Sequence, residues 1–224
     1  NGLSGVLSDS TVNGKVTAVQ ADLLSRTEDS IHALQLIRAY RARGHQIAQL
    51  DPLGLQIKES HPELEPATHG FQQGDMDREI YLGGVMELEQ ASVREILRLL
   101  KDTYCNTIGV ELTHIQDPEH KHWLQKRIES GRNQTDFSKE GKKAILERLT
   151  DAEGFERFLG TKYTGTKRFG LDGAEASVPA IEQILKVGGK MGLEQVVLGM
   201  AHRGRLNILV NVMHKPFTAI FSEF

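Results

Sequence analysis

The stretch that decides the fold reads QVVLGMAHRGRLN and spans residues 195–207. Its first six residues, Gln195 to Met200, form a short apolar run with adjacent valines, which predicts a buried strand. A helix is predicted directly after it, because apolar residues recur at helical spacing at Leu206, Leu209, Val210 and Met213. Another helix is expected over 173–186. The pattern predicts a helix–strand–helix unit of an α/β sheet.

The junction between the predicted strand and helix is also the candidate ligand site, because open α/β sheets bind ligands beyond the carboxyl ends of their strands. It contains His202, Arg203, Gly204 and Arg205. Free N–H groups at a helix start and two guanidinium groups favour an anion, and His202 can donate hydrogen bonds near neutral pH. The alternative is a pair of solvated arginines beside a buried structural histidine. The residues alone leave both interpretations open.

The sequence upstream predicts a mainly helical module over residues 25–161. Ser25 with Glu28 and Ser92 with Glu95 have the spacing of capping boxes, and Gly44 is a plausible helix stop. Further helices are predicted after Asp117-Pro118, after Ser138 and after Thr150, and a short strand over 108–115.

Three other segments complete the predicted organisation. Residues 1–24 are polar and contain glycines, which predicts a flexible lead-in. Residues 49–84 show no helical or strand periodicity and contain several prolines and glycines, which predicts a long irregular connection. Residues 162–224 are expected to be the start of an α/β domain. Because the last residues are apolar and end in mid-pattern, we expect the chain to be a fragment.

The composition is that of an ordinary soluble protein. The 224 residues are 39% hydrophobic and 25% charged, with a net charge of −3, which gives no basic field for nucleic acid. No apolar run approaches the ~20 residues of a membrane helix, and a secretory signal or transit peptide is not recognisable. The single cysteine, Cys105, excludes an internal disulfide.

A metal site is not predicted. His114, His120 and His122 lie near Asp117, but His120 and His122 are two residues apart on a predicted helix and do not share a face. We therefore expect them to be solvated.

Several separated segments resemble one enzyme family. VVLGMAHRGRLN at 196–207, LDPLGL at 50–55, YCNTIGVELTHI at 104–115 and AEGFERFLGTKYTGTKRFGL at 152–171 are similar, in this order, to the decarboxylase of the 2-oxoglutarate dehydrogenase complex. The resemblance covers residues 25–224, an amino-terminal part of a protein several times longer, and is nearest to bacterial members.

The resemblance implies a transketolase-like fold that binds thiamine diphosphate and Mg²⁺ in a homodimer. The family oxidatively decarboxylates 2-oxoglutarate in the tricarboxylic acid cycle and passes succinyl to the lipoyl group of a partner acyltransferase. His202 matches the active-site histidine that contacts substrate, and Arg203 matches an arginine near the cofactor diphosphate. Asp172 stands where the family commonly has glutamate, which puts a role for this carboxylate in doubt. The location implied is the bacterial cytoplasm, or the mitochondrial matrix in a eukaryote.

The metal ligands of the family are not found in this chain. No Gly-Asp-Gly followed by the magnesium-binding asparagine occurs, so we expect the fragment alone to be inactive. Two alternatives stay open. One is a 2-oxoadipate dehydrogenase component, whose substrate differs by one methylene; the other is a helical docking module without catalysis.

Overall fold

The computed structural model describes residues 9–57, 59–222 and 224, with side chains from residue 19 onward. Within these ranges the chain is mostly helical, with one two-stranded sheet. It separates into two compact units, unit 1 (Asn1–Thr135) and unit 2 (Asp136–Phe224). None of the helices in the described ranges is both long enough and apolar enough to cross a membrane. The predicted helical character of the amino-terminal part is confirmed.

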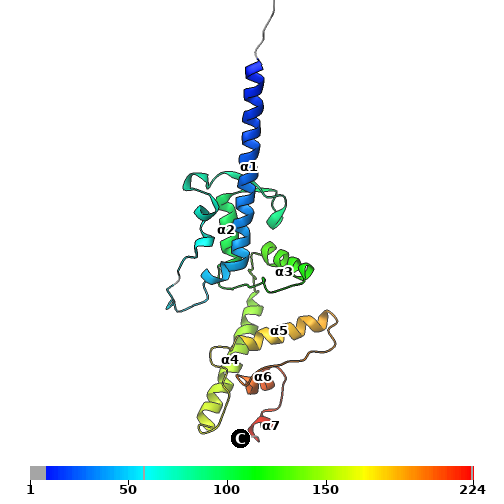
Figure 1. Cartoon of the computed structure of the whole chain (residues 1–224). Helices are drawn as coiled ribbons and strands as arrows, with labels where there is room; N and C mark the ends of the chain where they lie inside the picture. Colours follow the sequence, from blue (N-terminus) through cyan, green and yellow to red (C-terminus); the bar gives the residue numbers. More distant parts are fainter. Residues whose placement is uncertain (1–8, 58, 223) are drawn as a thin grey trace, which may run out of the picture. The chain divides into compact units, whose positions relative to one another are not determined.

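Helix α1 (Asp9–Arg43) begins earlier than the sequence predicts. It includes residues 9–24, which were expected to be a flexible lead-in, and it passes through Ser25 without a cap; residues 1–8 lie outside the described part. Extending a formed helix costs far less than starting one, and residues 9–24 contain no proline to stop the extension. The first half of α1 extends beyond the rest of unit 1 (Figure 1).

The second half of α1 packs against α2 (Val93–Tyr104) to form the core of unit 1. α2 begins as predicted, with Oγ of Ser92 accepting from the backbone N–H of Glu95 at 3.2 Å. Gly44 follows α1 because the helices approach closely there: a Cβ at this residue would lie 2.6 Å from the Cβ of Tyr104. The largest fully buried side chains of the core are Leu36, Ile37, Tyr40, Phe71, Ile80, Ile96, Leu100 and Tyr104.

Helix α3 (Pro118–Ser130) also begins where the sequence predicts. The carboxylate of Asp117 accepts from the N–H groups of Glu119 and His120 at 2.9 and 3.0 Å. The strand predicted over 108–115 is wrong, because this segment has no strand neighbour within the described ranges and runs as irregular backbone. Two short strands occur instead, β1 (Glu79–Tyr81) antiparallel to β2 (Gln90–Ser92), with Ile80 opposite Ala91.

The connection predicted over 49–84 is largely irregular, as expected, and is folded onto the unit by short 3-10 turns. Oδ2 of Asp51 accepts from the N–H groups of Leu55 and Gln56 at 2.6 and 2.8 Å, and Oδ1 from that of Leu53 at 3.0 Å. These bonds hold the pKa of Asp51 below its ordinary value. The turns within this connection are η2 (Pro62–Leu64), η3 (Pro66–His69) and η4 (Gln73–Asp75). Turn η1 (Gly44–Ile47) precedes the connection, and η5 (Val85–Glu87) follows β1.

A hydrogen-bonded ion pair ties α1, α2 and α3 together. Arg41 donates from Nε and Nη2 to the two carboxylate oxygens of Glu129 at 2.7 and 2.9 Å, and the hydroxyl of Tyr104 donates to the same carboxylate at 2.6 Å. The Glu129 side chain is 6% exposed and that of Arg41 24%. Burial and the adjacent carboxylate raise the pKa of Tyr104, which keeps the hydroxyl protonated as a donor.

Unit 2 is built around one long helix, α4 (Lys139–Lys162), where the sequence predicts two. Ser138 caps it, since its Oγ accepts from the N–H of Gly141 at 3.1 Å. Thr150, the expected second cap, donates its hydroxyl to the carbonyl of Leu146 inside the continuous helix. The helical module was expected to run to residue 161, but the structure places the whole of α4 in unit 2. The reason is packing, because its buried side chains contact α5 (Ser177–Lys190), α6 (Arg205–Asn211) and α7 (Phe217–Phe221).

The strand predicted over 195–200 is wrong, and with it the expected start of an α/β domain is not seen. The segment is irregular, and Val197 is 87% exposed. A strand needs a neighbour for its N–H and C=O groups, and none is present in the described part of unit 2. The helices on either side of it do form: α5 begins four residues later than predicted, and α6 carries Leu206, Leu209 and Val210.

Candidate functional site

The candidate residues His202 to Arg205 form a turn that is fastened to a second segment of unit 2. The N–H of Gly204 donates to the carbonyl of Phe169 at 2.7 Å, and Arg203 donates from Nη2 to the carbonyl of Asp172. The structure thus brings 202–205 against 169–173. We call 202–205 the HRGR turn.

Gly204 is required for this contact. It lies buried with a φ of +70°, a left-handed conformation that glycine adopts without a steric penalty. A Cβ at residue 204 would overlap the side chain of Leu171. Gly204 therefore lets the backbone of the turn approach the chain's own 169–173 segment closely.

The Phe169 ring organises the charged side chains of the turn. The guanidinium carbon of Arg205 lies 4.6 Å from the ring centroid, and the His202 ring lies 5.3 Å from it at an interplanar angle of 56°. Phe169 itself has a φ of +49°, which is uncommon outside glycine. A cation over an aromatic face is favourable, so Phe169 restricts the position of Arg205 while His202 and Arg203 stay exposed.

The HRGR turn is a cationic, solvent-facing edge, but the expected contribution of the helix start is small. The N–H of Gly204 is already used by Phe169, and the N–H of Arg205 donates to the carbonyl of His202 at 3.4 Å. α6 is only seven residues long. Attraction for an anion at this edge therefore comes from the side chains of His202, Arg203 and Arg205.

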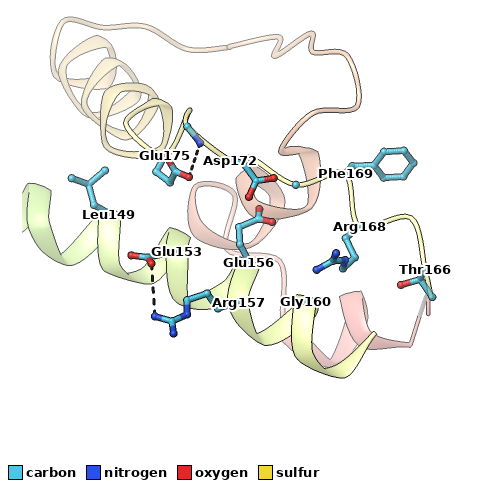
Figure 2. Close-up of a pocket in the computed structure, with 12 residues that line it drawn as sticks. Leu149, Glu153, Glu156, Arg157, Gly160, Thr166, Arg168, Phe169, Asp172 and Glu175 are labelled. Carbon is cyan, nitrogen blue, oxygen red and sulfur yellow. Dashed lines mark hydrogen bonds and ion pairs between the residues drawn. The ribbon is translucent and has the colours of Figure 1, made fainter. Parts of the chain in front are cut away.

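A pocket of about 880 Å³ is lined by α4 and by the segment 166–175. Figure 2 shows the carboxylates of Glu156 and Asp172 turned toward one another across it, with Arg168 entering from the loop. The gap between them is kept open by Gly170, where a Cβ would lie 2.7 Å from Asp172 and 3.2 Å from Glu156. Gly160 gives similar room to the guanidinium of Arg168. The sequence did not single out Glu156 or Arg168, because nothing in their local pattern places them beside residue 170.

Asn207 is a fully buried polar residue next to the site. Its Nδ2 donates to the carbonyl of Ala152 and to Oε1 of Glu156, both at 2.9 Å, and its Oδ1 accepts from Nδ2 of Asn211 at 2.6 Å. The side chain is 0% exposed. The sequence assigned Asn207 to the same motif as His202 without giving it a role.

The residues present fit part of a thiamine diphosphate site. Exposed His202, Arg203 and Arg205 offer donors and positive charge to the phosphates of a cofactor or to a carboxylate of a substrate. In the described ranges no three His, Cys, Asp or Glu side chains are grouped as a metal site would require. The geometry defines a cationic, solvent-exposed edge on a mainly helical segment.

Comparison with known proteins finds relatives of one kind. The chain is 56% identical over 204 residues to the 2-oxoglutarate dehydrogenase E1 components of Brucella canis, Brucella suis and Brucella melitensis. The match covers 91% of this chain and 20% of each of those proteins, in their amino-terminal part. No family model matches the chain. The resemblance found in the sequence is confirmed: the chain is related to the 2-oxoglutarate dehydrogenase E1 component and spans about one fifth of its length.

Proposed function

We propose that this chain is the amino-terminal segment of a 2-oxoglutarate dehydrogenase that contributes the HRGR turn to the thiamine diphosphate site. The observation that carries the proposal is the 56% identity over 91% of the chain. The full enzyme would oxidatively decarboxylate 2-oxoglutarate and transfer succinyl to the lipoyl group of a partner acyltransferase. It would act as a homodimer in the cytoplasm of a bacterium, or in the matrix of a mitochondrion.

Thiamine diphosphate, when bound with Mg²⁺, supplies the carbanion and the electron sink for decarboxylation. The chain's own residues bind and orient the substrate and the cofactor. His202 is exposed at the turn, where its imidazole donates to a carboxylate of 2-oxoglutarate. Arg203 lies next to it and supplies positive charge to the diphosphate. Phe169 limits where Arg205 can lie, so the positive edge is set before a ligand arrives.

A chimera tests the proposal directly. This chain replaces the matching segment of the Brucella melitensis E1 component, and carbon dioxide release is measured with thiamine diphosphate, Mg²⁺ and either 2-oxoglutarate or 2-oxoadipate. We expect turnover of 2-oxoglutarate by the chimera and none by the 224-residue chain alone. A folded, dimeric chimera without turnover would contradict the enzyme assignment and favour a docking module. A preference for 2-oxoadipate would contradict the proposal that 2-oxoglutarate is the substrate.

Two substitutions in the chimera separate the proposed roles. His202→Ala removes a charge-assisted hydrogen bond worth ~1.5–3 kcal/mol, which is roughly a ten- to hundredfold loss in kcat/KM for 2-oxoglutarate. Arg203→Ala should mainly raise the dissociation constant for thiamine diphosphate.

The matched controls are His114→Ala and Arg127→Ala, both exposed in unit 1. They should change neither parameter. If His202→Ala lowers the melting temperature and leaves kcat/KM of the folded enzyme intact, His202 is a structural histidine and the site assignment fails.

A further inference from the structure

A line of two buried side-chain amides, those of Asn211 and Asn207, connects α6 to α4. Asn211 donates to Asn207, and Asn207 donates both N–H groups of its amide, one to the Ala152 carbonyl and one to the Glu156 carboxylate. The amide of Asn207 thus has a partner on each N–H and on its oxygen. A buried amide costs free energy unless its hydrogen bonds are made, so this arrangement fixes the rotation of α6 about its axis.

The apolar contacts of α6 on either side of these amides do not fix its rotation in the same way. One face of α6 packs Ile208 and Val212 against Ala152, and the opposite face packs Leu206 and Val210 into a second apolar cluster. Apolar contacts tolerate small shifts, whereas hydrogen bonds depend steeply on distance and angle. Apolar burial therefore keeps α6 against α4, and the hydrogen bonds of Asn207 fix the register of α6 on α4.

The register of α6 determines where His202 lies. Asn207 is three residues after Gly204, and the N–H of Ile208 donates to the Gly204 carbonyl at 3.0 Å. Gly204 is in turn bonded to Phe169, against whose ring His202 packs. A shift at Asn207 is therefore passed through one helical turn to the candidate ligand-binding residues.

We propose that Asn207 and Glu156 are positioning residues that hold the HRGR turn in its ligand-binding geometry by their buried hydrogen bond. The expected change in kcat/KM rests on the proposed function, because it assumes that His202 contacts the substrate. Neither side chain is proposed to touch the ligands.

Reversing the polarity of the hydrogen bond tests the inference. Asn207→Asp replaces the donor with a carboxylate facing that of Glu156, so this bond is lost and like charges meet. The second bond of the Asn207 amide, to the Ala152 carbonyl, is lost as well, and for that reason the rescue described next is only partial. Adding Glu156→Gln supplies a side-chain amide that can donate in the opposite direction. In the chimera we expect Asn207→Asp to lower kcat/KM roughly ten- to a hundredfold, the size of effect that a small misplacement produces, and the double substitution to regain at least about tenfold of a hundredfold loss.

The pattern of affected parameters separates positioning from a loss of stability. Because His202 and Arg203 share one turn, Asn207→Asp should worsen both kcat/KM for 2-oxoglutarate and the thiamine diphosphate dissociation constant. In a His202→Ala background its effect on kcat/KM should shrink to less than about threefold, since the residue it positions is absent. The control is Val210→Ala, which shortens a buried side chain on the same helix. It should lower the melting temperature but not kcat/KM.

Hydrogen exchange in the 224-residue chain gives a readout that needs no activity. The amides of Gly204 and Ile208 should lose protection with Asn207→Asp and regain it with the double substitution. If the chimera turns over but the double substitution restores neither kcat/KM nor protection, the positioning role is wrong. If the unsubstituted chimera has no turnover, the proposed function fails, and the exchange measurement still decides whether Asn207 fixes the turn.

Discussion

The ion pair between Arg41 and Glu129 predicts a large and specific loss of stability when its carboxylate is removed. Glu129→Ala leaves the half-buried guanidinium of Arg41 and the Tyr104 hydroxyl without their acceptor. Removing one partner of a buried ion pair costs about 3–5 kcal/mol. Because the Arg41 side chain is 24% exposed and can recover some hydration, we expect the lower end of that range, about 3 kcal/mol. This corresponds to roughly 10 °C in melting temperature.

A double-mutant cycle isolates the part that belongs to Tyr104. Tyr104→Phe removes one hydrogen bond to a charged group, about 1.5 kcal/mol. In a Glu129→Ala background that bond is already lost, so the double variant should be destabilised by about 3 kcal/mol and not by the sum of about 4.5, a coupling of about 1.5 kcal/mol.

Urea unfolding followed by tryptophan fluorescence measures these values. Trp123 is the single tryptophan of the sequence and lies on α3, the helix that carries Glu129. Glu89→Ala, which removes an exposed carboxylate of the same unit, is the control and should change the free energy of unfolding by less than about 0.5 kcal/mol. A loss no larger than this for Glu129→Ala, or strict additivity with Tyr104→Phe, would refute the reasoning.

Three further outcomes are expected. Gly204→Ala should destabilise unit 2 by about 2–4 kcal/mol, since it adds a left-handed backbone penalty to an overlap with Leu171; calorimetry that finds an unchanged melting temperature would contradict this. The lowered pKa of Asp51 gives a stabilisation that is present above its unfolded pKa of about 3.9 and is lost as pH falls through the folded value. NMR titration should therefore find its midpoint below 3.9, and a midpoint at or above that value would count against the turn at 51–56. In hydrogen exchange, amides of Val196–Leu198 should be unprotected while those of Ile96–Leu100 are protected, and equal protection would show that the segment is paired.

Helix starts were predicted best, because the capping residue lies within a few residues of the N–H groups that it bonds. Ser92, Asp117 and Ser138 each accept a backbone N–H two or three residues later, and all three helices begin as expected. Thr150 shows the limit, because the same residue type can bond to the preceding helical turn when the helix has already started.

Features that depend on distant partners were not predictable from the residues alone. An apolar run at 195–200 has the composition of a strand, but a strand forms only beside another strand. The contact of Glu156 with Asn207 joins residues 51 positions apart, and neither lies in a pattern that indicates the other. The roles of His202 and Arg203 came from the resemblance to the enzyme family and stay predictions, while the structure adds that the turn carrying them is fastened to 169–173.

The irregular segment at 195–200 has a consequence for handling the isolated chain. It presents Val196, Val197, Leu198 and Met200 to solvent with backbone groups that have no strand neighbour in the described ranges. Such a stretch of β-branched and apolar residues is a template for intermolecular pairing. At high concentration the chain should therefore self-associate through this segment, and a charged residue in place of Val197 should improve its solubility without affecting the helices.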